Sequence, residues 1–176
     1  MKTLAEQLTM YAKYHRDPRN IATHFVGIPM IVVAIAILLS KPSLVVAGLV
    51  LSPATVVIVA ACLYYFKLSK PLGVLMSVLF GLTLYVAYKV AAMSAQVWLA
   101  WGIGLFVIGW VAQFIGHYYE GKKPAFVDDL SGLLIGPLFI VCELLFALGL
   151  LAETKGIVER EAGTIKHQTG PHANAS

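Results

Sequence analysis

Long apolar runs separated by short polar joints occupy the chain from residue 21 to residue 151. Each of five runs approaches about 20 residues, the length of helix that crosses a hydrocarbon core of about 30 Å. Because the joints are short, consecutive helices are expected to run antiparallel in one bundle. The pattern predicts five membrane-spanning or re-entrant helices, at Ile21–Leu39, Leu44–Phe66, Leu72–Tyr88, Val97–Tyr119 and Leu130–Leu151.

Both ends of the chain are more polar than this central part. In residues 1–20, apolar side chains recur at helical spacing, which predicts a short surface helix that ends before Pro18. Residues 152–176 are polar and are expected to form a flexible tail. Residues 1–151 are therefore predicted to form a single membrane-embedded domain of the all-α class, a polytopic helical bundle.

Composition supports a membrane protein and excludes several other classes. Hydrophobic residues make up 59% of the chain, charged residues 12%, and the mean hydropathy is +0.81. A soluble domain carries about a quarter charged residues, so this chain is too apolar for water. The two cysteines lie inside apolar runs, which argues against a disulfide framework and a cysteine-rich metal site. The net charge of +4 is too small to indicate nucleic-acid binding.

The basic residues predict how the bundle is oriented. With five spans, the N-terminus shares one side of the membrane with the second and fourth joints. Under the positive-inside rule this side faces the cytoplasm, of a bacterial inner membrane or an endoplasmic reticulum membrane. It carries eight of the 13 lysines and arginines, namely Lys2, Lys13, Arg16, Arg19, Lys67, Lys70, Lys122 and Lys123. The opposite side is expected to carry Lys41 and Lys89, together with Lys155, Arg160 and Lys166 of the tail.

Three of the five histidines fall on this cytoplasmic side. His15 and His24 flank the start of the first span, and His117 lies near the end of the fourth, one turn before Glu120. Imidazoles and a carboxylate with open coordination positions suit non-haem Fe(II) and its oxygen chemistry. Zinc held by three histidines and a water would instead indicate hydrolysis. The pattern predicts a metal site at the membrane surface, within reach of a lipid substrate.

Other polar residues near the spans have simpler interpretations. Asn20 stands where the N-cap of the first span is expected, and Asp128 and Asp129 precede the fifth span, where acidic residues favour a helix N-terminus. Glu143 lies well inside the fifth span, and a carboxylate at membrane depth is a candidate functional residue. Its part in the site stays open at this point.

Three segments resemble one known family. They are YAKYHRDPRNIATHFVGIPMI (Tyr11–Ile31), WVAQFIGHYYEGKKPAF (Trp110–Phe126) and GPLFIVCELLF (Gly136–Phe146). They are similar to the 2-hydroxy-fatty-acid dioxygenases, over roughly residues 5–150, and the elements YH-x₄-N-x₃-H and QF-x-GH-x₂-E are the most specific. The resemblance implies an Fe(II)-dependent enzyme of fatty-acid α-oxidation. Such an enzyme converts a 2-hydroxy fatty acid and O₂ to the fatty acid one carbon shorter plus CO₂.

The resemblance also implies roles for individual residues. His15, His24 and His117 would be metal ligands, with Glu120 as a fourth ligand or as a partner of the ligands. Gln113, one turn before His117, would hold a ligand imidazole or the substrate carboxylate. Asn20 also matches the motif, and beyond capping it would bind the substrate. Basic residues of the same face would attract the anionic substrate, namely Arg16, Arg19, Lys122 and Lys123.

Two other functions compete with this interpretation. A non-catalytic membrane protein that binds lipid or acts as a scaffold would carry the same apolar runs, and a zinc-dependent lipid hydrolase would use the same histidines. Membrane di-iron hydroxylases and desaturases need about eight or more histidines, which this chain lacks. The sequence leaves the chain length of the substrate and the oligomeric state open.

Overall fold

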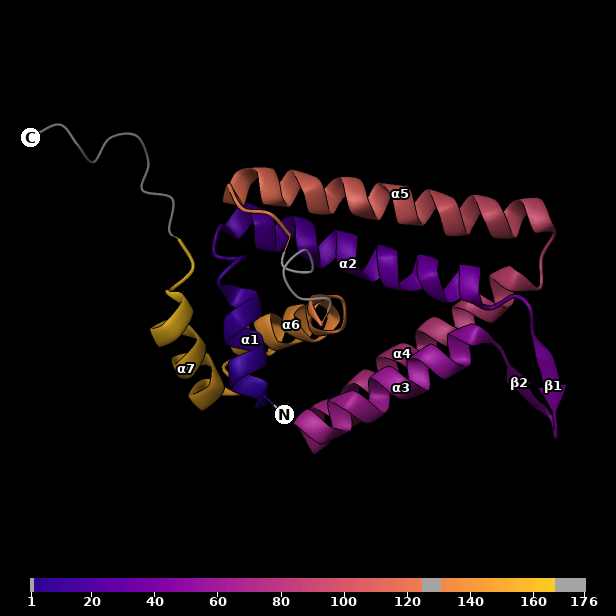
Figure 1. Ribbon diagram of the computed structural model, residues 1–176, viewed down its shortest axis with the longest axis horizontal. Helices are drawn as coiled ribbons and strands as arrows, with labels where there is room; N and C mark the ends of the chain where they lie inside the picture. Colours follow the sequence, from indigo (N-terminus) through magenta and orange to yellow (C-terminus); the bar gives the residue numbers. More distant parts are fainter. Residues whose placement is uncertain (1, 125–130, 167–176) are drawn as a thin grey trace, which may run out of the picture.

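The computed structural model describes residues 2–124 and 131–166 and is almost entirely helical there (Figure 1). Three of its helices are long and apolar enough to cross a membrane, and α6 with α7 passes the same test as a pair bent by 112°. The predicted all-α membrane bundle is therefore confirmed. In chain order the elements are α1 Leu4–Ala12, α2 Pro18–Leu39, β1 Leu44–Val46, β2 Leu49–Leu51, α3 Pro53–Leu68, α4 Lys70–Ala91, α5 Ala95–Glu120, α6 Gly132–Ala147 and α7 Ala152–Ala162.

Helices α2 and α5 lie side by side along their length (Figure 1). Glycines at a spacing of seven residues, Gly102, Gly109 and Gly116, form one stripe of α5. A Cβ atom built at Gly109 would lie 3.0 Å from the carbonyl oxygen of Gly27 on α2, and one at Gly27 would lie 2.7 Å from that of Gly109. Small residues let membrane helices approach this closely. The approach places the first turns of α2 against the last turn of α5.

The predicted second span is wrong at its start. Residues 44–51 form an antiparallel hairpin in which Val45 pairs with Val50, and helix α3 begins only at Pro53. Ser52 caps α3 by accepting a hydrogen bond from the backbone N–H of Thr55, and proline suits the next position because a first-turn N–H needs no partner. An apolar run alone does not distinguish a strand from a helix. The start of α3 is marked instead by the Ser52-Pro53 pair.

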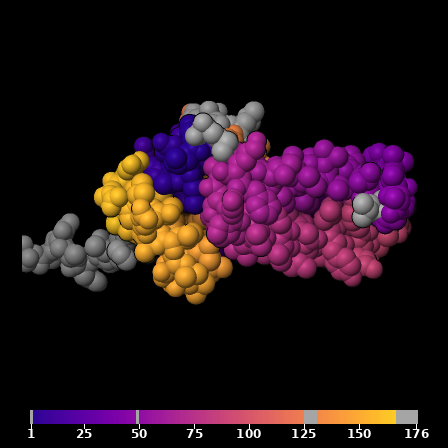
Figure 2. Space-filling view, turned by 90° about the horizontal axis from the view of Figure 1, so that it is seen from below, coloured from indigo at the N-terminus to yellow at the C-terminus, as the bar shows by residue number. Residues whose placement is uncertain are grey.

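The fifth predicted span is also interrupted. Helix α6 ends at Ala147, and the chain turns through Gly149, at φ +77°, and Leu151, at φ 55°, into α7. Residues 152–162 were expected to belong to a flexible tail, but they form α7, which packs against α1 (Figure 2). Val158 of α7 is only 1% exposed. The expectation failed because α7 becomes stable through burial against α1, which no local pattern shows.

The position of α7 changes the topology at the end of the chain. Because α7 contacts α1, and the backbone N–H of Lys166 donates to the carbonyl oxygen of Arg16 over 2.9 Å, the chain returns to the end of the bundle where it began. The α6–α7 pair is therefore re-entrant, and the basic residues of the last segment lie with the N-terminus rather than opposite it. The predicted helix-start residues Asp128 and Asp129 lie outside the described residues.

The outer surface of the bundle is apolar. On α5, bulky side chains that face away from α2 are between about one-third and three-fifths exposed, among them Ile103, Val107, Ile108, Val111 and Phe114. A continuous exposed apolar surface of this kind is costly in water and matches a hydrocarbon environment.

Candidate metal centre

The three histidines predicted to share one face lie together in the structure. His15 lies in the turn between α1 and α2, His24 in the second turn of α2, and His117 in the last turn of α5. All three side chains are buried, and one ligand nitrogen from each lies within 4.8 Å of the others. The glycine contact between α2 and α5 and the turn after α1 bring them together.

Hydrogen bonds fix which ring nitrogen carries the proton in His15 and in His24. Nδ1 of His15 lies 2.7 Å from the carbonyl oxygen of Tyr11, and Nδ1 of His24 lies 2.9 Å from that of Asn20. A carbonyl oxygen only accepts, so both Nδ1 atoms are assigned as the N–H donors. In the neutral rings each Nε2 is then a bare lone pair, and the two Nε2 atoms lie 3.0 Å apart. Two facing lone pairs repel each other, whereas a cation between them is attracted by both.

This donor set fits a metal ion. Around one ion with bonds of about 2.1 Å, ligand nitrogens lie about 3.0 Å apart at a right angle and about 3.4 Å apart at a tetrahedral angle. The His15–His24 pair already has this spacing. Burial, with a smaller contribution from His24, holds the pKa of His15 well below its ordinary value, so this imidazole stays neutral as a ligand must.

Glu120 fastens the turn that carries the first histidine. Its Oε2 accepts hydrogen bonds from the backbone N–H groups of Arg16, over 2.8 Å, and Asp17, over 2.6 Å. The same oxygen accepts from the side-chain amide of Asn20 over 3.3 Å, and Oε1 lies 3.4 Å from the ammonium group of Lys166. The carboxylate thus ties the end of α5 to the α1–α2 turn, and it does not belong to the cluster of three imidazoles.

The N-cap of α2 is Asp17 and not Asn20, so that prediction is wrong. The Asp17 side chain accepts from the backbone N–H of Arg19 over 2.8 Å, and Pro18 occupies the first helical position. The helix therefore begins three residues before the apolar run does. Asn20 lies inside the helix, where its side-chain amide also donates to the carbonyl oxygen of Tyr14 over 3.1 Å. It supports the geometry of the turn.

Glu143 reaches the edge of this cluster through Arg16. The two side chains are 9% and 6% exposed and form an ion pair of 3.1 Å. Arg16 also donates from Nε to the carbonyl oxygen of His15 over 2.8 Å and from Nη1 to that of Gly163 over 3.2 Å. A buried carboxylate needs such a partner. The re-entrant path of α6 brings Glu143 to the histidine end of the bundle. The acidic residue predicted inside the fifth span therefore lies next to the turn that carries His15.

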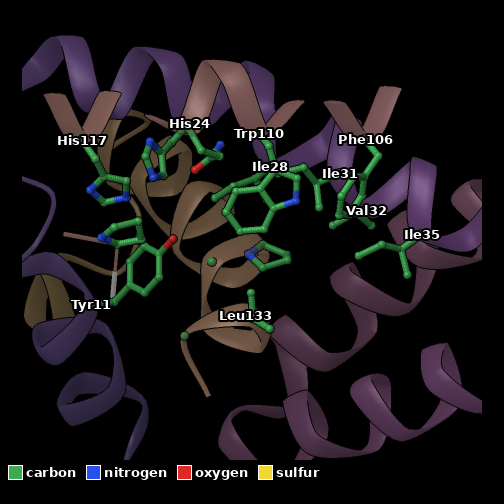
Figure 3. Close-up of a pocket in the computed structure, with 15 residues that line it drawn as sticks. Tyr11, His24, Ile28, Ile31, Val32, Ile35, Phe106, Trp110, His117 and Leu133 are labelled. Atoms are coloured by element: carbon green, nitrogen blue, oxygen red, sulfur yellow. The ribbon is translucent and has the colours of Figure 1, made fainter. Parts of the chain in front are cut away.

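An apolar cavity of about 310 Å³ runs from the histidines between α2, α5 and α6. Figure 3 shows His24 and His117 at one end and Phe106, Val32 and Ile35 at the other. The volume is within the range of pockets that bind small molecules. Such a shape suits a molecule with a polar head at the histidines and a long apolar tail.

Five of the predicted substrate-binding residues do not line this cavity, namely Arg16, Arg19, Asn20, Lys122 and Lys123. Arg19 pairs with Asp17 over 2.9 Å, and the ammonium group of Lys122 donates to the carbonyl oxygen of Lys13 over 2.6 Å. The charged groups of Arg19, Lys122 and Lys123 are exposed at the rim of the bundle, whereas Arg16 and Asn20 are buried outside the cavity.

Two polar side chains do line the cavity beside the histidines. Gln113, one turn before His117, is 5% exposed, and its Nε2 has no hydrogen-bond partner within the described residues. Tyr11 stacks on the His15 ring, with centroids 4.2 Å apart, and its hydroxyl points into the cavity (Figure 3). Burial raises the pKa of Tyr11, so its hydroxyl keeps its proton and can donate it in a hydrogen bond.

Sequence reasoning missed Tyr11, which it counted only as an apolar position of the first helix. The signal was its place four residues before His15, which brings two ring side chains onto one helical face. The unpartnered amide and the phenol together give the apolar cavity two hydrogen-bond donors next to the imidazoles.

Comparison with known proteins agrees with this arrangement. Residues 1–148 match the family described as 2-hydroxy-palmitic acid dioxygenase Mpo1-like. The chain is 32% identical over 162 residues to 2-hydroxy-palmitic acid dioxygenase MPO1 of Saccharomyces cerevisiae, which covers 90% of this chain and 88% of that protein. No solved structure matches the chain. The chain belongs to the Mpo1-like family of 2-hydroxy-palmitic acid dioxygenases.

Proposed function

We propose that this protein is an Fe(II)-dependent dioxygenase that shortens 2-hydroxy fatty acids by one carbon. One observation carries the proposal: the unprotonated Nε2 atoms of His15 and His24 face each other, with His117 beside them. They lie at one end of a long apolar cavity that suits an acyl chain. The name of the yeast relative supplies the substrate class. A lipid-binding scaffold would not need two buried imidazoles with their lone pairs facing each other beside a third buried imidazole.

The proposed reaction balances without a further reductant. A 2-hydroxy acid, R–CH(OH)–COOH, and O₂ give R–COOH, CO₂ and water. The C1–C2 bond breaks, C2 is oxidised from the alcohol to the acid level, and C1 leaves as CO₂. Together the two carbons lose four electrons, which is the number that one O₂ takes up. A flavin, a nicotinamide or an oxoacid co-substrate is therefore unnecessary.

The side chains around the cavity divide this work. His15, His24 and His117 would hold the iron, which when bound supplies open coordination positions and the redox chemistry of oxygen. Gln113 donates from Nε2 to the substrate carboxylate, and the Tyr11 hydroxyl donates to a substrate oxygen, so the reacting carbons are held beside the imidazoles. Apolar walls exclude water from the acyl chain. Of the two roles that the sequence left open for Glu120, ligand or partner of the ligands, we assign it the second: it holds the turn that carries His15.

The end of the bundle that holds the histidines is proposed to face the cytoplasm. With α7 returned to α1, every lysine and arginine except Lys41 and Lys89 belongs to a segment at this end. This distribution is more one-sided than five full spans would give, and it follows the positive-inside rule. The fatty acid would then enter with its carboxylate attracted by the basic rim.

The test is reconstitution of the purified protein with Fe(II) in the absence of oxygen, followed by 2-hydroxypalmitate and O₂. Mass spectrometry should detect pentadecanoate and CO₂ with wild type and with Tyr118→Ala, whose side chain is 84% exposed beside His117. His117→Ala should lose both the bound iron and the product. Bound iron without product in wild type would overturn the proposed reaction. Neither iron nor product would favour the scaffold interpretation.

A further inference from the structure

A second apolar cavity, of about 190 Å³, continues the first away from the histidines. Four residues line both cavities, namely Val32, Ile35, Leu133 and Pro137. The second cavity lies between α2, α3, α4 and α6, and small side chains such as Ala36, Ala54 and Ala61 give it room. The hydroxyl of Tyr65 is the polar side-chain group on this wall, and it donates to the carbonyl oxygen of Leu134 over 2.7 Å.

The lengths of the two cavities can be compared with an acyl chain. Eleven residues separate His24 from Ile35 at the end of the first cavity, which is about 16 Å along α2. Fifteen separate His24 from Leu39 at the end of the second, about 22 Å. Carbon–carbon bonds of about 1.5 Å at about 111° advance an extended chain by about 1.25 Å each. The first cavity alone therefore accepts about 13 carbons, and both together about 18.

We infer that the second cavity holds the terminal carbons of the substrate and sets the longest chain that the protein accepts. The inference rests on the proposed function, because it concerns the tail of the same substrate. A chain of 16 carbons, as in the substrate that names the yeast relative, exceeds the first cavity and fits the two in series. Among the described residues that line this cavity, the polar side chain is Tyr65, and its hydroxyl already donates to Leu134, so the occupant is the apolar end of a molecule whose polar head lies elsewhere.

Two substitutions change the volume of the second cavity in opposite directions. Ala61→Leu fills it, whereas Phe80→Leu enlarges it. Ala60→Leu is the matched control, because the neighbouring alanine on α3 is exposed while Ala61 is buried. The measurement is kcat/KM of the iron-loaded protein for 2-hydroxy acids of graded length, from well below the capacity of the first cavity to beyond that of both.

Filling the cavity should affect long chains alone. Each methylene that loses its apolar site lowers kcat/KM about fourfold. Because leucine adds three carbon atoms, Ala61→Leu should lower the value for 2-hydroxypalmitate about 50-fold and leave a short 2-hydroxydecanoate within about twofold of wild type. Ala60→Leu should leave both values unchanged. Phe80→Leu should move the optimum to longer chains by about one or two carbons.

The outcomes separate this inference from the proposed function. Wild type that turns over no 2-hydroxy acid of any length refutes the proposed function. An active wild type with the same length profile in Ala61→Leu and Phe80→Leu refutes the role of the second cavity. If Ala61→Leu loses activity at every length through misfolding, the profile of Phe80→Leu decides, and an unshifted optimum there overturns the inference.

Discussion

The two ends of the cavity along α2 are built differently. At the histidine end, buried polar atoms are held by specific partners, as Nδ1 of His15 is by Tyr11 and the Glu120 carboxylate is by two backbone N–H groups. At the far end most of the walls are apolar side chains such as Val32, Ala61 and Phe80, which only occupy volume. Under the proposed function, chemistry would depend on atomic positions at one end and selectivity on volume at the other. Single substitutions should abolish activity at the first end and shift preference at the second.

The largest effect is expected from removing a ligand. His24→Ala removes one of the three clustered imidazole nitrogens. Bound iron should therefore fall below about one-tenth of the wild-type content, and the turnover rate should fall by about 1000-fold or more. Val32→Ala, two turns further along the same helix, should lower turnover of 2-hydroxypalmitate less than about tenfold. Metal analysis and product formation measure both. Equal losses in the two variants would remove the distinction between the two ends.

Glu120→Gln tests whether the carboxylate supports the ligands or binds the metal itself. As a support, it loses its charge-assisted hydrogen bonds to the α1–α2 turn, and metal affinity should fall about 10-fold to 100-fold. Competition with a chelator measures the affinity, with the exposed Glu153→Gln as the control. A loss of iron as complete as in His24→Ala would show instead that Glu120 is a ligand.

Two glycines of α5 compare its packed and open faces. A Cβ atom at Gly116 would lie 2.6 Å from the side-chain oxygen of Asn20, beside the histidines, whereas one at Gly104 would meet nothing within 4 Å. Gly116→Ala should destabilise the protein by about 1–3 kcal/mol and weaken metal binding, because α2 and α5 are forced apart. Gly104→Ala should be neutral or slightly stabilising. Thermal unfolding in detergent would refute the packing argument if both variants melt alike.

Removing one hydroxyl should have a smaller effect. Tyr11→Phe keeps the ring that stacks on His15 and loses the donor that points into the cavity. We expect kcat/KM to fall about tenfold, the loss of one hydrogen bond to the substrate, with iron content unchanged. An unchanged kcat/KM would show that the phenol serves packing alone.

The smallest effect concerns pH in the metal-free protein. Burial lowers the pKa of His15 in the folded state, so the unfolded chain binds more protons below an ordinary histidine pKa of about 6.5. Stability should therefore decrease as the pH falls from 7 to 5.5, by about 1 kcal/mol from this group. Thermal unfolding of wild type and His15→Gln measures the difference in slope. Equal slopes would mean that His15 titrates normally in the folded protein.

The histidine cluster was predictable because it depends on topology. His15, His24 and His117 stand beside the ends of two apolar runs that an antiparallel bundle brings to one side, and the resemblance added their role as metal ligands. The seven-residue spacing of the glycines in α5 is visible in the sequence, but only the structure shows that these glycines face α2. An apolar run gives the presence of a helix more reliably than its first residue, as Ser52-Pro53 and Asp17-Pro18 show.

The remaining features depend on contacts between distant segments. The helical conformation of residues 152–162 follows from packing on α1, and the place of Glu143 follows from the re-entrant path of α6 and its ion pair with Arg16. The role of Glu120 depends on a turn about 100 residues earlier in the chain. None of these is encoded in a local period or spacing, so a single sequence does not predict them.

The most direct test of the central claim is the stoichiometry of the reaction with two metals. Wild-type protein is loaded with Fe(II) or with Zn(II), and O₂ uptake, CO₂ release and shortened acid are quantified together with 2-hydroxypalmitate. We predict one O₂ consumed for each CO₂ and each pentadecanoate formed with iron, and no turnover with zinc. Turnover with zinc, or product formed in the absence of O₂, would contradict the assignment of an iron-dependent dioxygenase.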